Sequence, residues 1–242
     1  MNVPTVVLVH GAFADSRSWE GVLERLLDQG VAVNAVANPL RGVAIDAAYV
    51  GDVIDAIGGP VLLVGHAYGG MVITQAAADR PDVLGLVYVS AFAPEHDESV
   101  FGLSRTFFGS TLDEALAAYP LSTGGTELVI RPDVFRQQFA ADVSAEAAAV
   151  MAAAQRPVTE AALVENLSTE KPAWKTLPSW FAFGDLDRTI PVSLHRFMAV
   201  RAGALGTTEV PGGSHALSVS HPYQVVATIF DALDHLTRKD ES

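Results

Sequence analysis

The sequence predicts an α/β fold with a mostly parallel, doubly wound sheet and a helical lid. Short β-branched apolar runs alternate with segments of helical periodicity, and glycine-rich turns follow several of these runs. Such alternation is typical of a parallel sheet with helices on both faces. One long segment breaks the alternation, which indicates an insertion. A chain of 242 residues is long enough for one large domain with a full hydrophobic core.

The first half of the chain follows the pattern most clearly. Residues 5–9 form a β-branched apolar run shortly before Gly11, which predicts a buried strand that ends in a turn. Helical spacing of apolar residues begins at Trp19, and Gly30 can end that helix. By the same reasoning we expect helices over 19–27 and 43–57 and strands over 31–36 and 61–64.

The second half resumes the alternation after the insertion. The expected elements are a helix over 70–80, strands over 84–90, 180–183 and 207–210, and helices over 192–201 and 222–236. Residues 91–177 contain no convincing strand, but Thr111 to Glu114 reads as a capping box and Pro132 can open a further helix. We therefore expect a core of residues 1–90 and 178–242, with 91–177 as a helical lid, in one domain overall.

Composition narrows the function classes. Fifteen basic and 28 acidic side chains give a formal charge of −13, which disfavours nucleic acid and anionic membranes as partners. The chain has no cysteine, so disulfides and thiol chemistry are excluded. Its first residues lack a basic leader, and the apolar run there is too short to cross a bilayer. We expect a cytoplasmic protein that acts on a small molecule, and the oligomeric state is not indicated.

Four loops are candidates for the chemistry, because ligands of open parallel sheets lie beyond the carboxyl ends of the strands. Each loop follows an expected strand and contains glycine. They are His10-Gly-Ala-Phe13, Gly65-His-Ala-Tyr-Gly-Gly70, Gly184-Asp-Leu-Asp187 and Gly212-Gly-Ser-His215.

These loops resemble the α/β-hydrolase fold, and within it the small esterases and the plant methylesterase and hydroxynitrile-lyase group. The resemblance covers nearly the whole chain and is weakest in the lid. It places Ala67 at the nucleophile position of the strand-to-helix elbow and implies Asp187 as the acid and His215 as the base. It also implies that the backbone amides of Ala12 and Tyr68 form the oxyanion hole. Asp185 is a rival for the acid, since it can instead cap its turn.

Alanine at position 67 departs from the family pattern, because without a hydroxyl no acyl-enzyme can form there. We interpret the chain as a serine hydrolase scaffold for a carboxylic ester with an apolar part, inactive through an engineered serine-to-alanine change. The alternatives are a natural small-molecule binder and a different reaction on the same fold. That reaction could be cofactor-free oxygenation, a lyase reaction, or dehalogenation or epoxide hydrolysis with a replaced aspartate. Ala216 counts against hydroxynitrile cleavage, because those plant enzymes carry lysine there.

Other residues are assigned by their surroundings in sequence. Four aromatic residues are expected at an apolar substrate pocket: Phe13, Phe107, Tyr119 and Trp174. His10 and His66 are expected to support their turns. The remaining histidines have no carboxylate or second histidine at metal spacing, so we expect them to be solvated or packed: His96, His195, His221 and His235. Neither a metal nor a nucleotide cofactor is expected, since the glycine spacing fits no phosphate loop.

Overall fold

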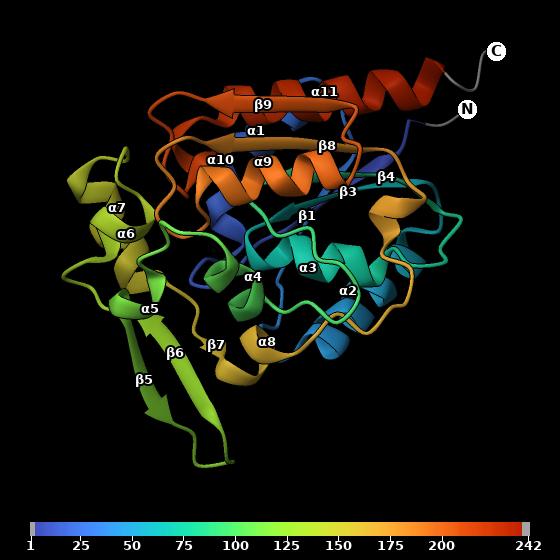
Figure 1. Cartoon of the computed structure of the whole chain (residues 1–242). Coiled ribbons are helices and arrows are strands. Elements are labelled where there is room, and N and C mark those ends of the chain that lie inside the picture. Colours follow the sequence, from blue (N-terminus) through green and yellow to red (C-terminus); the bar gives the residue numbers. More distant parts are fainter. Residues whose placement is uncertain (1–2, 239–242) are drawn as a thin grey trace.

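The computed structural model describes residues 3–238. Its main sheet has six parallel strands in the order β2-β1-β3-β4-β8-β9 (Figure 1). The strands are β1 (Thr5–Val9), β2 (Val33–Val36), β3 (Val61–His66), β4 (Val83–Val89), β8 (Ser179–Gly184) and β9 (Gly206–Val210). The chain starts at β1, adds β2 on one side and all later strands on the other. Loops that follow β1 and β3 therefore lie next to each other at the carboxyl edge.

Helices cover both faces of this sheet, as the alternation of strands and helices predicts. Buried apolar residues of α2 (Val43–Ile57), α3 (Tyr68–Ala76) and α9 (Val192–Arg201) pack on one face. The other face is covered by α1 (Glu20–Asp28) and α11 (Pro222–Arg238), with the short η1 (Ser16–Trp19) and α10 (Leu217–Ser220) nearby. Alternate residues of one strand enter the two layers, as expected where both faces are buried. Val7 and Val9 face the first layer, and Val6 and Leu8 the second.

Most elements outside the insertion lie where the sequence places them, and the fold class is confirmed. The strand over residues 5–9 and the helices over 43–57 and 192–201 coincide with the expected ranges. Larger differences occur at the elbow, where β3 runs on to His66 and α3 begins at Tyr68 rather than at residue 70. The helix predicted to end at residue 80 ends at Ala76.

The insertion differs from the expectation that it holds no strand. It contains α4 (Val100–Thr106), α5 (Leu112–Ala115), β5 (Leu116–Pro120), β6 (Thr126–Ile130), α6 (Phe135–Phe139), α7 (Ala145–Ala154), β7 (Val158–Thr159), α8 (Glu160–Val164) and η2 (Ala173–Lys175). Its strands form an antiparallel sheet in the order β5-β6-β7. In Figure 1, β5 and β6 form an arm that extends away from the main sheet.

The expectation of no strand is wrong, because this segment carries the sequence signal of a β-hairpin. Gly124 and Gly125 both have positive φ, at 91° and 87°, and they turn the chain directly before the β-branched run of β6. The expected helix starts are also shifted. Thr111 makes no cap to α5, because its hydroxyl donates to Gln138 instead, and Pro132 precedes the start of α6 at Phe135.

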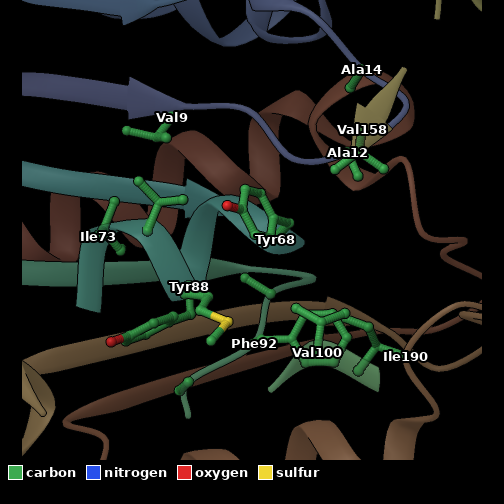
Figure 2. Close-up of a cluster of buried hydrophobic side chains, with 14 of the residues drawn as sticks. Val9, Ala12, Ala14, Tyr68, Ile73, Tyr88, Phe92, Val100, Val158 and Ile190 are labelled. Carbon is green, nitrogen blue, oxygen red and sulfur yellow. The ribbon is translucent and has the colours of Figure 1, made fainter. Parts of the chain in front are cut away.

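The insertion shares a hydrophobic core with the sheet. Figure 2 shows side chains of this cluster from the main sheet and its loops, such as Val9 and Ala12, together with Val100 and Val158 of the insertion. This shared burial fixes the insertion against residues that follow the strands, such as Ala12 and Phe92. The insertion therefore covers the carboxyl edge of the sheet.

Candidate active site

The elbow lies between β3 and α3, and Ala67 is its single connecting residue. Ala67 has φ 51° and ψ −119°, a conformation that costs a residue with a Cβ about 1–3 kcal/mol. The turn is so tight that a Cβ built on Gly65 would lie 2.7 Å from the carbonyl of Gly69. Only glycine fits there. The sharp turn thus presents the side chain of residue 67 at the end of the sheet.

The loop after β1 lies against the elbow. A Cβ built on Gly11 would lie 2.6 Å from the Cβ of Ala67. Among the hydrogen bonds found in residues 3–238, none uses the amide of Ala12 or of Tyr68 as donor, whereas the next amide in the first loop, that of Phe13, donates to the carbonyl of Arg156. The arrangement leaves two backbone donors free near position 67.

Asp187 and His215 are brought together from the loops after β8 and β9. His215 Nδ1 donates to Asp187 Oδ2 at 2.8 Å, and both side chains are buried. The other carboxylate oxygen, Oδ1, accepts from the amides of Thr189 and Ile190 at 2.8 and 2.9 Å. These bonds fix the carboxylate and orient the imidazole, so Nε2 of His215 is the nitrogen left to exchange a proton.

The rival acid has another role. Asp185 accepts a hydrogen bond at 2.6 Å from the amide of Gly212 in the loop that leads to His215. It therefore ties the two loops together, while Asp187 is the carboxylate that contacts the imidazole.

His66 joins the elbow to the histidine loop. Its Nε2 donates to the backbone carbonyl of His215 at 3.0 Å, and the two rings lie 4.9 Å apart. The neighbour of Ala67 thus holds the backbone of His215. In the first loop, His10 Nδ1 donates to the Gly11 carbonyl at 2.9 Å, and its own carbonyl accepts from Asn38.

Burial and hydrogen bonds determine the charges at this site. Burial alone would raise the pKa of Asp187, but His215 and His195 more than offset it and hold that pKa well below its usual range. Burial lowers the pKa of His66 to about 3 and that of His10 to about 4. At neutral pH Asp187 is therefore ionised, and these two supporting imidazoles are neutral.

His195 is the residue that sequence reasoning missed. It was expected to lack a carboxylate partner, yet its Nε2 lies 3.1 Å from Asp187 Oδ2. The ring is fully buried and stacks on Phe183 with centroids 4.8 Å apart. The signal was present in the sequence: His195 lies in the first turn of the helix that begins five residues after Asp187, so one loop brings the two together.

The other histidines lie outside this arrangement. His96 Nδ1 donates to the Thr169 carbonyl, and the His235 ring packs edge-on against Trp180. His221 does have a carboxylate neighbour, since its Nδ1 lies 3.3 Å from Asp142. No cluster of three potential metal ligands occurs within residues 3–238.

The four aromatic residues expected at a substrate pocket do not gather in one place. Only Phe13 lines the cavity of about 330 Å³ that lies between the first loop, η1 and α7. Phe107 packs on Phe197, and Trp174 is buried with its indole N–H donating to the carbonyl of Pro94. Tyr119 lies in the β5–β6 arm, where its hydroxyl donates to Glu127.

The cavity wall is mainly apolar. Its apolar lining residues are Phe13, Ala14, Ala147, Val150, Met151, Ala154 and Val219, and its polar ones are Asp15, Arg17, Ser18, Glu20 and Gln155. Phe13 directly follows Ala12, and Val219 belongs to the short α10, which begins two residues after His215. The lining therefore includes neighbours of Ala12 and His215 in sequence, but not Ala67, Asp187 or His215 themselves.

Fold and site define the class of protein. The sequence model of the Alpha/beta hydrolase family matches residues 6–229, and the chain belongs to this family. No helix within the described residues has the length and apolar character needed to span a bilayer.

Particular relatives are similar over different lengths. A carbendazim hydrolyzing esterase from Nocardioides sp. (strain SG-4G) is 58% identical over 45 residues, which are 18% of this chain and 18% of that protein. A solved polyneuridine aldehyde esterase is 21% identical, with a TM-score of 0.80 over 96% of this chain and 99% of its own. Tomato methylketone synthase I in complex with 2-tridecanone is 17% identical, with a TM-score of 0.80 over 98% and 100%. At these identities the two structures show a shared fold.

Proposed function

We propose that this chain is a carboxylic ester hydrolase scaffold in which Ala67 replaces the serine nucleophile, so that it binds its ester but does not cleave it. The observation that carries the proposal is the elbow itself. Ala67 keeps φ 51°, and His215 and Asp187 are joined by a hydrogen bond of 2.8 Å. Strain of this kind is expected where a functional side chain has to be presented.

The roles follow from the donors and acceptors of each group. With serine at position 67, His215 Nε2 takes the hydroxyl proton during attack on the ester carbonyl and returns it to the leaving alcohol, which leaves an acyl-serine. Water then attacks the acyl group, giving its proton to the same Nε2, which returns a proton to the serine oxygen as the acid leaves. Asp187 stabilises the imidazolium formed in between. The amides of Ala12 and Tyr68 donate to the oxyanion of the tetrahedral intermediate. With alanine at position 67, His215, Asp187 and the two amides are all present, but there is no hydroxyl to attack the ester.

The substrate class follows from the cavity. The cavity between η1 and α7 has a volume of about 330 Å³ and a mainly apolar wall, which suits an apolar acyl or alcohol part of modest size. The charged side chains of the cavity lining are Asp15, Arg17 and Glu20, so the cavity has no excess of positive charge to bind an anion, which favours a neutral ester. The similarity to a protein named as an esterase supports the same class.

The test is to restore the hydroxyl. Ala67→Ser should hydrolyse p-nitrophenyl butyrate at least about 10³-fold faster than the unchanged chain, because loss of the nucleophile costs up to about 10⁶ in kcat in serine proteases. A fluorophosphonate should add covalently to the introduced serine, as seen by mass spectrometry of the intact protein. The double variant Ala67→Ser with His215→Asn is the matched control, and it should lose both signals. A folded serine variant without turnover and without labelling would reject the proposal.

A second candidate is direct proton transfer by His215 without a covalent intermediate. It is favoured by the completeness of the acid–base pair: Asp187 keeps four donors although residue 67 has no nucleophile. A buried imidazole oriented in this way can remove a proton next to a carbonyl group.

The two candidates differ in what the unchanged chain does. Proton transfer predicts that it exchanges the α-protons of a small methyl ketone with D₂O, and that His215→Asn stops the exchange. Ester hydrolysis through residue 67 predicts no exchange by either protein. NMR signal loss at the α-position measures this directly.

A further inference from the structure

We propose that His195 is a positioning residue of this site, whose Nε2–H holds the Asp187 carboxylate in place and shares the oxygen that receives His215. Its effect on catalysis rests on the proposed function. The hydrogen-bond arrangement does not, and it can be measured in the chain with Ala67.

The geometry on Asp187 carries the proposal. Oδ2 lies 2.8 Å from His215 Nδ1 and 3.1 Å from His195 Nε2, and Oδ1 accepts two backbone amides. All four donors meet one carboxylate whose side chain is wholly buried. A carboxylate with this many donors cannot rotate without breaking several of them. His195 supplies the one side-chain donor, besides His215, among the four that restrain Asp187.

His195 is held as a neutral donor. Its Nδ1 is buried and has no partner in the described part of the chain, so a proton on that nitrogen would be left unsatisfied. Burial also lowers the pKa of His195, which disfavours the imidazolium. Stacking on Phe183 at an interplanar angle of 7° fixes the ring. A neutral Nε2–H donor then withdraws charge from Oδ2 without adding a positive charge of its own.

The consequence for His215 has a definite sign. A carboxylate that shares its charge with a second donor stabilises an imidazolium less strongly. Loss of the His195 donor should therefore move the titration of His215 to higher pH. The charged and titratable groups around this cluster include His66, His10 and Glu209, with Arg196 paired to Glu209 on the exposed side. They also include Asp142, which accepts hydrogen bonds from Ser214 next to His215, and its neighbour His221. None of them changes between the variants below.

The experiment uses ¹⁵N-labelled histidine in the chain with Ala67. In His195→Phe, which keeps an aromatic ring beside Phe183, the His215 titration midpoint should rise by at least about 0.5 pH unit, and its low-field Nδ1 proton should shift. In His195→Gln, the side-chain amide places a donor at the position of Nε2. The His215 titration midpoint should then stay within about 0.2 pH unit of the parent value, and the Nδ1 proton should keep its chemical shift. His96→Gln, remote from the site, serves as the unchanged control. Equal behaviour of the Phe and Gln variants, in either direction, would overturn the proposal.

A measurement without any substitution covers the case in which the Phe variant does not fold. The ¹⁵N shifts of the unmodified chain must identify His195 as the neutral Nε2–H tautomer throughout the titration of His215. An Nδ1–H tautomer or an imidazolium at neutral pH would reject the role assigned to His195.

The same His195 variants made together with Ala67→Ser distinguish a failure of this proposal from a failure of the proposed function. With Ala67→Ser, the acidic limb of the pH profile of kcat/KM should move to higher pH in His195→Phe and return in His195→Gln. If Ala67→Ser has no activity but the NMR difference is present, ester hydrolysis fails and the role of His195 stands. A purely structural histidine would change stability and leave both titrations in place.

Discussion

The two sides of the candidate site are built in different ways. On the acid–base side, Asp187 accepts four hydrogen bonds and His215 is held by its ring and by its backbone carbonyl. On the elbow side, Ala67 is placed by backbone geometry alone, through close glycine contacts and a positive φ. The first side depends on side-chain chemistry. The second side can lose its functional group and still keep its shape.

This difference explains how a complete acid–base pair can persist beside an alanine. The close contacts of the glycines around the elbow set the turn independently of the side chain at residue 67. By contrast, loss of Asp187 would leave two buried imidazoles without an acceptor. Three experiments can break or sharpen this contrast.

The largest effect is expected on the acid–base side. In Ala67→Ser with Asp187→Asn, kcat for p-nitrophenyl butyrate should fall by about 10⁴ relative to Ala67→Ser alone. The reason is geometric: the two backbone amides take the oxygen of the new amide, so its NH₂ faces His215 and forces the wrong tautomer. Stopped-flow kinetics measures the loss. A fall of less than tenfold would show that the carboxylate does not orient the base.

The buried supporting imidazoles should make stability depend on pH. His66 binds its proton near pH 6.5 when unfolded and near pH 3 when folded, so the unfolded state takes up the proton first as the pH falls. Stability is therefore full above about pH 6.5 and decreases below it, by about 2 kcal/mol for this residue between pH 7 and 5. Urea unfolding at both pH values measures it.

The matched variants for this prediction are His66→Gln and His96→Gln. The first keeps a donor for the His215 carbonyl and should lose about 2 kcal/mol less than the parent between the two pH values. The second changes a half-exposed histidine outside the site and should follow the parent. If all three proteins lose the same stability, the buried imidazole is not the cause.

The smallest effect is expected at the elbow. Ala67→Gly relieves the positive φ but loses a buried methyl and gains freedom in the unfolded chain, so stability should stay the same or rise by about 1 kcal/mol. The control Ala76→Gly, in the last turn of α3, should lose about 1–2 kcal/mol. Thermal unfolding compares the two. An equal loss at both positions would mean that the elbow holds no strain.

Much of this arrangement could be predicted from local patterns. The strand run before Gly11, the glycine-flanked turn around Ala67 and the late Asp187 and His215 loops all have signals within a few residues. Local sequence patterns did not predict features that depend on packing between distant segments. The β5–β6 arm forms where no strand is expected, and Tyr119 and Trp174 do not line the cavity next to Phe13. Apolar periodicity indicates that a side chain is buried, but it does not indicate which surface the side chain packs against.

The sequence by itself determined the order of strands and helices outside residues 91–177, the tight elbow and the lack of a hydroxyl at residue 67, because each is set by residues close together in the chain. Only the tertiary structure decided that His66 holds the His215 loop, and that the two imidazoles of His195 and His215 share one oxygen of Asp187. Those contacts join β3, β8, α9 and the loop after β9, whose approach is fixed by the parallel sheet and its buried core.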